Sequence, residues 1–334
     1  MPEPAPEARR ETQAALPLAT LPGASQPAPP VGPPPGGATS LADAEGPGIQ
    51  ARSQLRMATE RFIRHRVALI GLFLFVGLVL WSTVGPLFWK YSFTQVTNDN
   101  AVGPSAQHPF GTDLIGHDLF AQVMTAEATS VKTALVVAVI ATALGTLVGA
   151  TAGYYGKWVD MALMRVTDLF LAVPLLAVLL VVANKLSKQA GSWFWIAIIL
   201  AAVLWTPLAR LVRGAFLSLR EREFVEAERA IGASDARIIG RHMIPNAMGP
   251  ITVNATLTVA LALLIEAALS FLGLGIQPPE VSLGLLVNTG QDAASTLPWL
   301  FYFPAGFLVL TVLSVNFIGD GLRDALDPTQ RGSR

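Results

Sequence analysis

The sequence predicts an all-α polytopic membrane protein with six transmembrane helices. Its composition, its long uncharged runs and the distribution of its arginines indicate this class. Of the 334 residues, 52% are hydrophobic and only 14% are charged, whereas a soluble domain carries roughly a quarter charged residues. The absence of cysteine excludes disulfides and thiolate metal sites, and the four histidines are scattered.

Residues 1–55 are predicted to form a disordered cytoplasmic tail. The first fifty residues hold 12 of the 24 prolines, set among alanine, glycine, serine and threonine. Such a segment has too few large apolar side chains to offset the entropy lost on folding. We expect a solvated extension, with a docking tail as the alternative.

Six apolar runs follow, each close to the length of about 20 residues that crosses a bilayer. The first span and an external loop occupy residues 56–127, the other five spans form a core over 128–326, and 327–334 is a C-terminal tail. Arg165 and Asp168 interrupt the third run, and their i, i+3 spacing predicts a structural ion pair on one helix face. The predicted spans are Val67–Trp89, Thr133–Gly156, Met161–Ala183, Gln189–Ala209, Met243–Ile265 and Ala293–Gly319.

Two of these spans carry features that shape helix packing. Gly145, Gly149 and Gly153 recur every four residues in the second span and predict a face that packs closely against another helix. Pro174 is expected to kink the third span.

The basic residues predict orientation, because cytoplasmic segments of membrane proteins are enriched in arginine and lysine. Every arginine lies before the first span, at Arg165, between Arg210 and Arg241, or after the last span. The segments expected outside contain no arginine, and their only lysines are Lys90, Lys132, Lys185 and Lys188. Both termini and the loop at residues 214–245 are therefore predicted to be cytoplasmic.

Two segments expected outside are long enough to meet a delivered substrate or an external partner. Lys90–Glu127 contains HPFGTDLIGHD, and Ile276–Pro298 contains QPPEVSLG. The alternative is a pair of solvated loops that pack on the helix ends.

The polar stretch Ser218–Ala247 is predicted to form two short helices, because its apolar residues recur at helical spacing. Gly232 is expected to end the first helix in the left-handed conformation. Ser234 or Asp235 is expected to accept backbone N–H bonds at the start of the second helix, and Pro245 to terminate it. Such an amphipathic elbow fits the groove of a soluble partner; a helix lying on the lipid surface is the alternative.

This stretch resembles a known motif. Glu226-Ala227-Glu228, three residues, Gly232 and then twelve residues to Pro245 are similar to the EAA loop of permease subunits in ATP-binding-cassette (ABC) importers. Five ordered stretches, which with the spans between them cover nearly everything after residue 55, resemble the C-type permease of the dipeptide, oligopeptide and nickel importers. They are HPFGTDLIGHDLF (His108–Phe120), GYYGKWVDMALMRVTDLFLAVP (Gly153–Pro174), ARLVRGAFLSLREREFVEAERAIGASDARIIGRHMIPN (Ala209–Asn246), EAALSFLGLGIQPP (Glu266–Pro279) and NFIGDGLRDALDP (Asn316–Pro328).

The resemblance implies a type I ABC importer permease fold and a coupling helix that docks into ATPase subunits. It implies a homologous B-type permease, two ABC ATPase subunits, an extracytoplasmic substrate-binding protein and a peptide substrate, all at a bacterial inner membrane. Nickel chelates or glutathione-like peptides are alternative cargo. The ATPase-coupling residues that it implies are Glu226, Ala227, Glu228, Gly232, Ala233, Ser234, Asp235, Ile244 and Pro245.

The chain is not expected to be an enzyme or to bind a cofactor, a metal or nucleic acid. It contains no glycine-rich phosphate loop with its lysine. ATP hydrolysis is therefore assigned to the partner ATPases.

Three residues depart from the family pattern. Glu228 stands where alanine is usual, which adds a charge where the elbow packs. His242 stands where many permeases have an apolar residue. His117 replaces an arginine in the external GTD-x-x-GRD pattern, which weakens the expectation of a fixed ion pair there.

Glu266 interrupts the fifth span, where a charge costs on the order of 2.5–3.5 kcal/mol on insertion scales. It is a candidate for the translocation path, with a hydrogen bond to a neighbouring helix or to the partner permease as the alternative. A proton-coupled secondary transporter using Glu266 or Asp168 is a competing class, but the sequence shows none of its usual repeats with broken midplane helices. A membrane scaffold that transports nothing is a third possibility.

Overall fold

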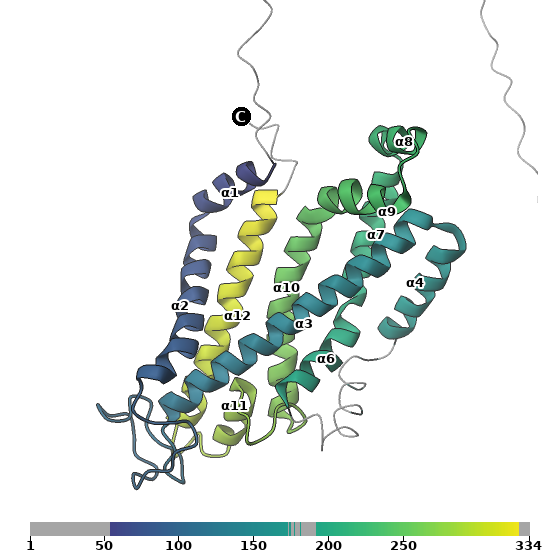
Figure 1. Cartoon of the computed structure of the whole chain (residues 1–334). Helices are drawn as coiled ribbons and strands as arrows, with labels where there is room; N and C mark the ends of the chain where they lie inside the picture. The colour runs from purple at the N-terminus through teal and green to yellow at the C-terminus, as the bar shows by residue number, and fades with distance from the viewer. Residues whose placement is uncertain (1–53, 173, 175–176, 178–180, 182–191, 327–334) are drawn as a thin grey trace, which may run out of the picture. The chain divides into compact units, whose positions relative to one another are not determined.

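The computed structural model describes residues 54–172, 174, 177, 181 and 192–326 (Figure 1). Nearly all of the predicted tail 1–55, and all of the tail 327–334, lie outside the described residues. In the described part, helices make up the regular structure, apart from two isolated β-bridges in the loop that follows the first span. The all-α prediction is confirmed.

Four described helices are long and apolar enough to cross a membrane. A fifth span is obtained if two shorter helices, which meet at an angle of 41°, are counted together. The four are α2 (Arg66–Phe88), α3 (Leu119–Tyr155), α10 (Ile244–Phe271) with the short helices leading into it, and α12 (Trp299–Leu326); the bent pair is α6 (Trp193–Leu204) and α7 (Thr206–Arg220).

The third predicted span is represented by α4 (Lys157–Ala172). Most of the residues that follow it in Met161–Ala183 lie outside the described part of the chain. A sixth span and a kink at Pro174 therefore stay predictions. The remaining described elements are α1 (Gln54–Arg64), α8 (Glu223–Ala230), α9 (Asp235–Arg237), the π-helix η2 (Ile238–Met243) and α11 (Leu283–Gln291).

The long helix α3 runs obliquely across the bundle and contacts most of its other helices (Figure 1). The glycine face predicted in it lies against α7. A Cβ atom at Gly145 would stand 2.7 Å from the carbonyl oxygen of Trp205, and one at Gly153 would stand 2.5 Å from the Cβ of Phe216. The close-packing prediction is confirmed, and the helix that fills the face belongs to the same chain.

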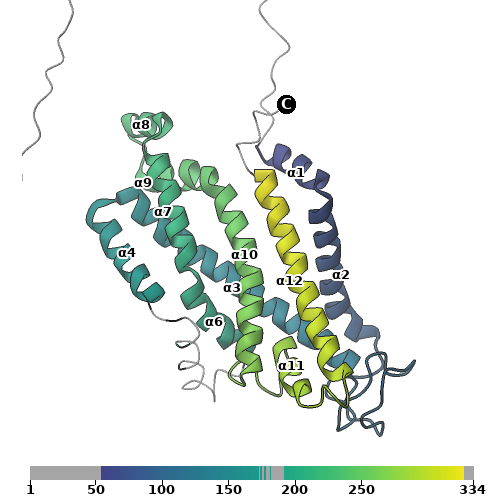
Figure 2. The same cartoon turned by 180° about the vertical axis from the view of Figure 1, so that it is seen from behind.

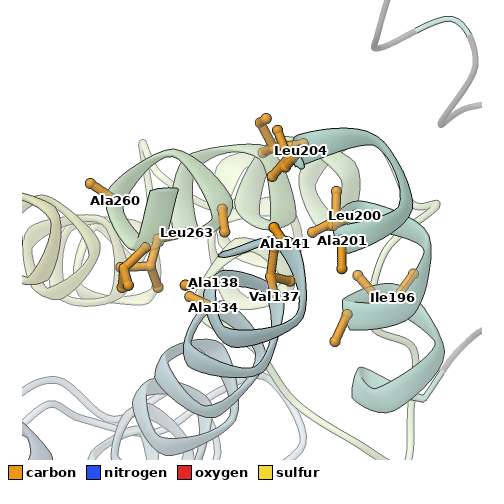
Figure 3. Packing of buried hydrophobic residues seen from close by; sticks show 14 of the residues in the cluster. Ala134, Val137, Ala138, Ala141, Ile196, Leu200, Ala201, Leu204, Ala260 and Leu263 are labelled. Carbon is orange, nitrogen blue, oxygen red and sulfur yellow. The ribbon is translucent and has the colours of Figure 1, made fainter. Parts of the chain in front are cut away.

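The main hydrophobic core forms where α3 passes between α6 and α10 (Figure 3). Small residues of α3 let the neighbouring helices approach, and branched residues of α6 and α10 fill the space between them. The labelled members are Ala134, Val137, Ala138 and Ala141 of α3, Ile196, Leu200, Ala201 and Leu204 of α6, and Ala260 and Leu263 of α10.

The helices define two ends of the bundle, and both views agree on them (Figures 1 and 2). One end, here called the α8 end, carries α1, α8, α9 and the C-terminal end of α12. The other, here called the α11 end, carries α11 and the loop between α2 and α3.

Candidate functional site

The helix α8 projects at the α8 end and stops at a sharp turn (Figure 1). Gly232 has φ +80. Its N–H donates to the carbonyl of Arg229, and the N–H of Ala233 donates to the carbonyl of Glu228, both at 3.0 Å. These two bonds form a Schellman motif, which requires the left-handed conformation at its glycine. The predicted end of the helix at Gly232 is confirmed.

The start of the next helix differs from the prediction. Ser234 occupies the N-cap position, but its side chain makes no capping bond. The carboxylate of Asp235 accepts a 2.6 Å hydrogen bond from the hydroxyl of Tyr154 on α3 instead. The tyrosine holds this carboxylate away from the backbone, so α9 begins without the predicted side-chain cap.

Pro245 does not terminate the second helix. It lies in the first turn of α10, and the chain is helical from Asp235 to Phe271. The π-helix immediately before it explains why: the N–H of Ile244 donates to the carbonyl of Ile239, five residues back. A π-bulge widens the backbone locally, and proline is tolerated where a helix segment begins because its missing N–H is not needed there.

The inner face of α8 is fixed by packing. Val225 is fully buried against Phe216 of α7 and against Ile238 and Met243 of the π-helix. One buried side chain of α8 thus meets two elements that lead into the bundle. This contact sets where α8 lies relative to α7 and η2.

The outer face of α8 is open in the described chain. Ile231 is 78% exposed and Phe224 is 37% exposed. Glu226 and Ala227, the first two residues of the EAA pattern, are also exposed. A mixed apolar and acidic surface on a protruding helix suits a second protein chain.

Glu228 faces the other way and contacts the second unusual residue of this segment. Its Oε1 lies 3.2 Å from Nε2 of His242 in the π-helix, and the side chains are 24% and 29% exposed, respectively. The two departures from the family pattern therefore face one another across the elbow.

Asp168 pairs with Arg210 and not with Arg165. Arg210 Nη2 lies 2.5 Å from Asp168 Oδ1, and Arg213 Nη2 lies 2.6 Å from Asp160 Oδ2. Two ion pairs thus join α4 to α7. The i, i+3 prediction was wrong because α7 runs beside α4 and brings its arginines to the acidic face.

Glu266 is fully buried within the chain. Its carboxylate accepts hydrogen bonds from Ser130 of α3 at 3.0 Å and from Ser270 at 2.7 Å. Ser270 also accepts from Ser282, and Ser130 accepts from the backbone N–H of Leu283. Glu266 thus ties α3 and α10 to the segment that begins α11, as the alternative of a hydrogen bond to a neighbouring helix predicts. A role in the translocation path stays a prediction.

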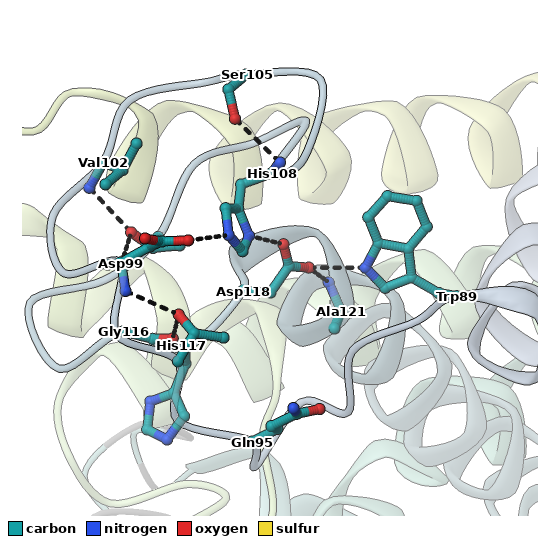
Figure 4. Close-up of polar contacts among 12 residues, drawn as sticks. Trp89, Gln95, Asp99, Val102, Ser105, His108, Gly116, His117, Asp118 and Ala121 are labelled. Carbon is teal, nitrogen blue, oxygen red and sulfur yellow. Dashed lines mark hydrogen bonds and ion pairs between the residues drawn. The ribbon is translucent and has the colours of Figure 1, made fainter.

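The loop at the α11 end is built around a buried histidine (Figure 4). His108 lies with Nδ1 2.7 Å from Asp118 and Nε2 3.3 Å from Asp99. Asp118 also accepts bonds from the indole of Trp89 and from the N–H of Ala121, so it caps α3. This part of the loop packs on the end of α3, as the alternative of loops packed on the helix ends predicts, and its histidine and its capping aspartate are buried.

The other histidine of this loop also has a partner. Nδ1 of His117 lies 2.8 Å from Asp113, whose carboxylate further accepts the backbone N–H groups of Ile115 and His117. Replacement of the usual arginine thus leaves a fixed contact in place. A cavity of about 470 Å³ adjoins it, between this loop and the α11 segment.

The comparisons with known proteins agree with this architecture. Residues 145–332 match the family described as the binding-protein-dependent transport system inner membrane component. The chain belongs to this family. Residues 53–109 match the N-terminal transmembrane domain of oligopeptide transport permease C.

Similar proteins of this permease family occur in several bacteria. The oligopeptide transport system permease proteins OppC of Mycobacterium tuberculosis and Mycobacterium bovis are each 41% identical over 283 residues, which is 84% of this chain and 97% of theirs. The protein of the same name from Bacillus subtilis is 37% identical over 295 residues, 88% of this chain and 96% of its own.

The permease brings together only part of the predicted site. Gly232, Ala233, Ser234 and Asp235 form one elbow, while Ile244 and Pro245 lie in the first turn of α10, and Glu266 lies farther along that helix. Tyr154, Arg210 and Arg213 were missed, although Arg210 and Arg213 share a helix face by their spacing, as do Asp160 and Asp168. Among the described residues, no cluster of three or more histidine, aspartate or glutamate side chains is placed to hold a metal ion.

Proposed function

We propose that this chain is the C-type permease subunit of an ATP-driven importer of oligopeptides. The α8 elbow is the observation that carries the proposal, because a helix with an open outer face leads directly into a membrane span. The similar proteins from three bacterial species are named oligopeptide permease proteins. The alignments with these proteins cover more than four-fifths of this chain.

The proposed assembly has four other protein chains. A homologous B-type permease completes the pathway, two ABC ATPase subunits bind the coupling loops, and an external substrate-binding protein delivers the peptide. ATP binding closes the ATPases, moves α8 and its counterpart, and shifts the permease pair from inward-open to outward-open.

In this assembly the α8 end faces the cytoplasm. The distribution of arginine supports that orientation, and so does the placement of α1 and the end of α12 beside the elbow (Figure 1). Because the chain has no native cysteine, single cysteines in place of the exposed Ile231 and Ile115 test it. In intact cells an impermeant maleimide should label I115C and spare I231C; the reverse labelling would refute the orientation.

Uptake tests the transport function itself. The five-chain complex, reconstituted in liposomes with ATP on the ATPase side, should accumulate a labelled oligopeptide, and the complex lacking this chain should not. Nickel chelates and glutathione-like peptides serve as competitors. If one of these compounds were taken up and oligopeptides were not, the proposed substrate would be wrong. The proposal that the chain belongs to an ATP-driven importer would still stand.

A proton-coupled carrier is the second candidate, and it rests on the buried carboxylate of Glu266. That carboxylate accepts hydrogen bonds from two serine hydroxyls and is fully buried within the chain. The chain reconstituted alone under a pH gradient should transport nothing. Peptide uptake under those conditions would support the carrier.

A further inference from the structure

We propose that Glu228 and His242 brace the elbow, so that α8, the π-helix and α10 move as one lever. The inference rests on the proposed function, in which an ATPase subunit pushes α8. It assigns Glu228 and His242 as positioning residues, with no contact to ATP or to the peptide.

The elbow needs a brace because its turn is open. A Cβ atom added at Gly232 would have no neighbour within 4 Å. Only Ala233 and Ser234 separate this glycine from the next helix. The packing of the buried Val225 holds α8 against the π-helix. A push on α8 would load this apolar contact and the open turn at Gly232 together, so a polar contact across the turn would make the elbow more rigid.

The contact between Glu228 and His242 spans this turn. Glu228 lies in the last turn of α8, and His242 lies near the end of the π-helix, 3.2 Å away. The carbonyl of His242 also accepts a 2.6 Å hydrogen bond from the side chain of Asn246 in α10. His242 thus connects α8 to the first turn of the membrane span.

Tyr154 supplies a second link, but to another helix. Its hydroxyl donates to Asp235, and the guanidinium of Arg229 lies 5.2 Å from its ring centre. These contacts tie both sides of the turn to the end of α3. Among the described residues, the Glu228–His242 contact is the polar side-chain contact that joins α8 to the segment continuing into α10.

Loss of the brace should lower the number of peptides transported per ATP hydrolysed. Glu228→Ala and His242→Ala should each reduce this ratio about threefold, which is the size of effect expected from one part-exposed polar contact. ATP hydrolysis and co-purification of the ATPases should persist. Glu221→Ala is the matched control, since it removes an exposed acid from the same segment and should leave the ratio unchanged.

The exchanged pair separates a specific contact from general damage. Glu228→His combined with His242→Glu should restore most of the ratio, because the same two groups again face one another. A double variant no better than the sum of the single changes would overturn the proposal. So would an unchanged ratio in both alanine variants.

A chemical cross-link tests rigidity directly. Glu228→Cys with His242→Cys, joined by a short bis-maleimide, should transport as well as the wild type, while the unlinked double variant should resemble Glu228→Ala. Loss of transport on cross-linking would show that the elbow must flex and would overturn the proposal that it moves as one lever.

A separate experiment tests the proposed docking function on which this inference rests. That function fails if wild-type ATPases do not bind the permease, or if they still bind when Ile231→Arg disrupts the outer face of α8.

Discussion

The two ends of α10 are held by polar contacts of opposite character. At the α8 end, the pair of Glu228 and His242 is about one-quarter exposed. At the α11 end, Glu266 is fully buried and accepts from Ser130 and Ser270. One helix thus begins at a contact that water and another chain can reach and ends in a sealed hydrogen-bonded cluster.

The difference in burial indicates that the two ends of α10 are held with different strength. A part-exposed polar pair contributes at most about 1 kcal/mol. A satisfied buried network is costly to break, because each orphaned group loses its partner without regaining water. We infer that the α11 end is the fixed point of the lever and that the α8 end is the point where force enters.

Glu266→Ala should give the largest effect. It removes the acceptor of two serine hydroxyls and leaves a cavity, which should destabilise the permease by about 2–3 kcal/mol. Thermal unfolding of the purified complex in detergent measures the loss. Glu266→Gln keeps one acceptor oxygen and should lose about half as much stability. Equal stability of the alanine variant and the wild type would contradict the inference that the α11 end is the fixed point of the lever.

His108→Ala probes the same end outside the helices. Asp118 would lose one partner but keep the indole of Trp89 and the N–H of Ala121, so the expected loss is about 1–2 kcal/mol. Thermal unfolding measures it, with Gln107→Ala as a control at the exposed neighbouring position of the same loop. A loss larger than that of Glu266→Ala would move the fixed point from the serine cluster to the loop.

Gly232→Ala tests the turn at the α8 end. The site has open space but φ +80, so alanine should cost about 1 kcal/mol through backbone strain and not through a clash. Transport per ATP should fall with little change in thermal unfolding of the membrane spans. Gly240→Ala is the matched control, because Gly240 also has open space and its φ lies outside the left-handed range; equal losses in the two variants would contradict strain as the cause.

Features with a local cause could be predicted from the sequence. Gly232 was found because a left-handed helix end favours glycine, and the face of Gly145, Gly149 and Gly153 because close packing requires small residues at a four-residue period. The long apolar runs predicted membrane spans because the thickness of the bilayer sets the length of a spanning helix.

Features that depend on distant segments could not be predicted in this way. The partner of Asp168 is 42 residues away in sequence, so spacing along one helix gave the wrong arginine. Pro245 was misjudged because a π-helix precedes it, and the sequence pattern carries no clear signal for such a turn. Glu228 and His242 were noted separately as departures from the family pattern, but only the folded elbow shows that their side chains are in contact.

His117→Arg should give the smallest effect. Asp113 already accepts two backbone N–H groups and contacts the imidazole, and an arginine at this position also places a hydrogen-bond donor beside it. Because the pair is part-exposed, the expected change in stability is below about 0.5 kcal/mol, and uptake of a labelled oligopeptide should stay within about twofold of the wild type. His117→Ala leaves the backbone bonds to Asp113 intact and should cost only slightly more. If either variant instead abolished uptake while thermal unfolding stayed normal, the cavity beside Asp113 would have a role in transport, and the α11 end would be more than a fixed point.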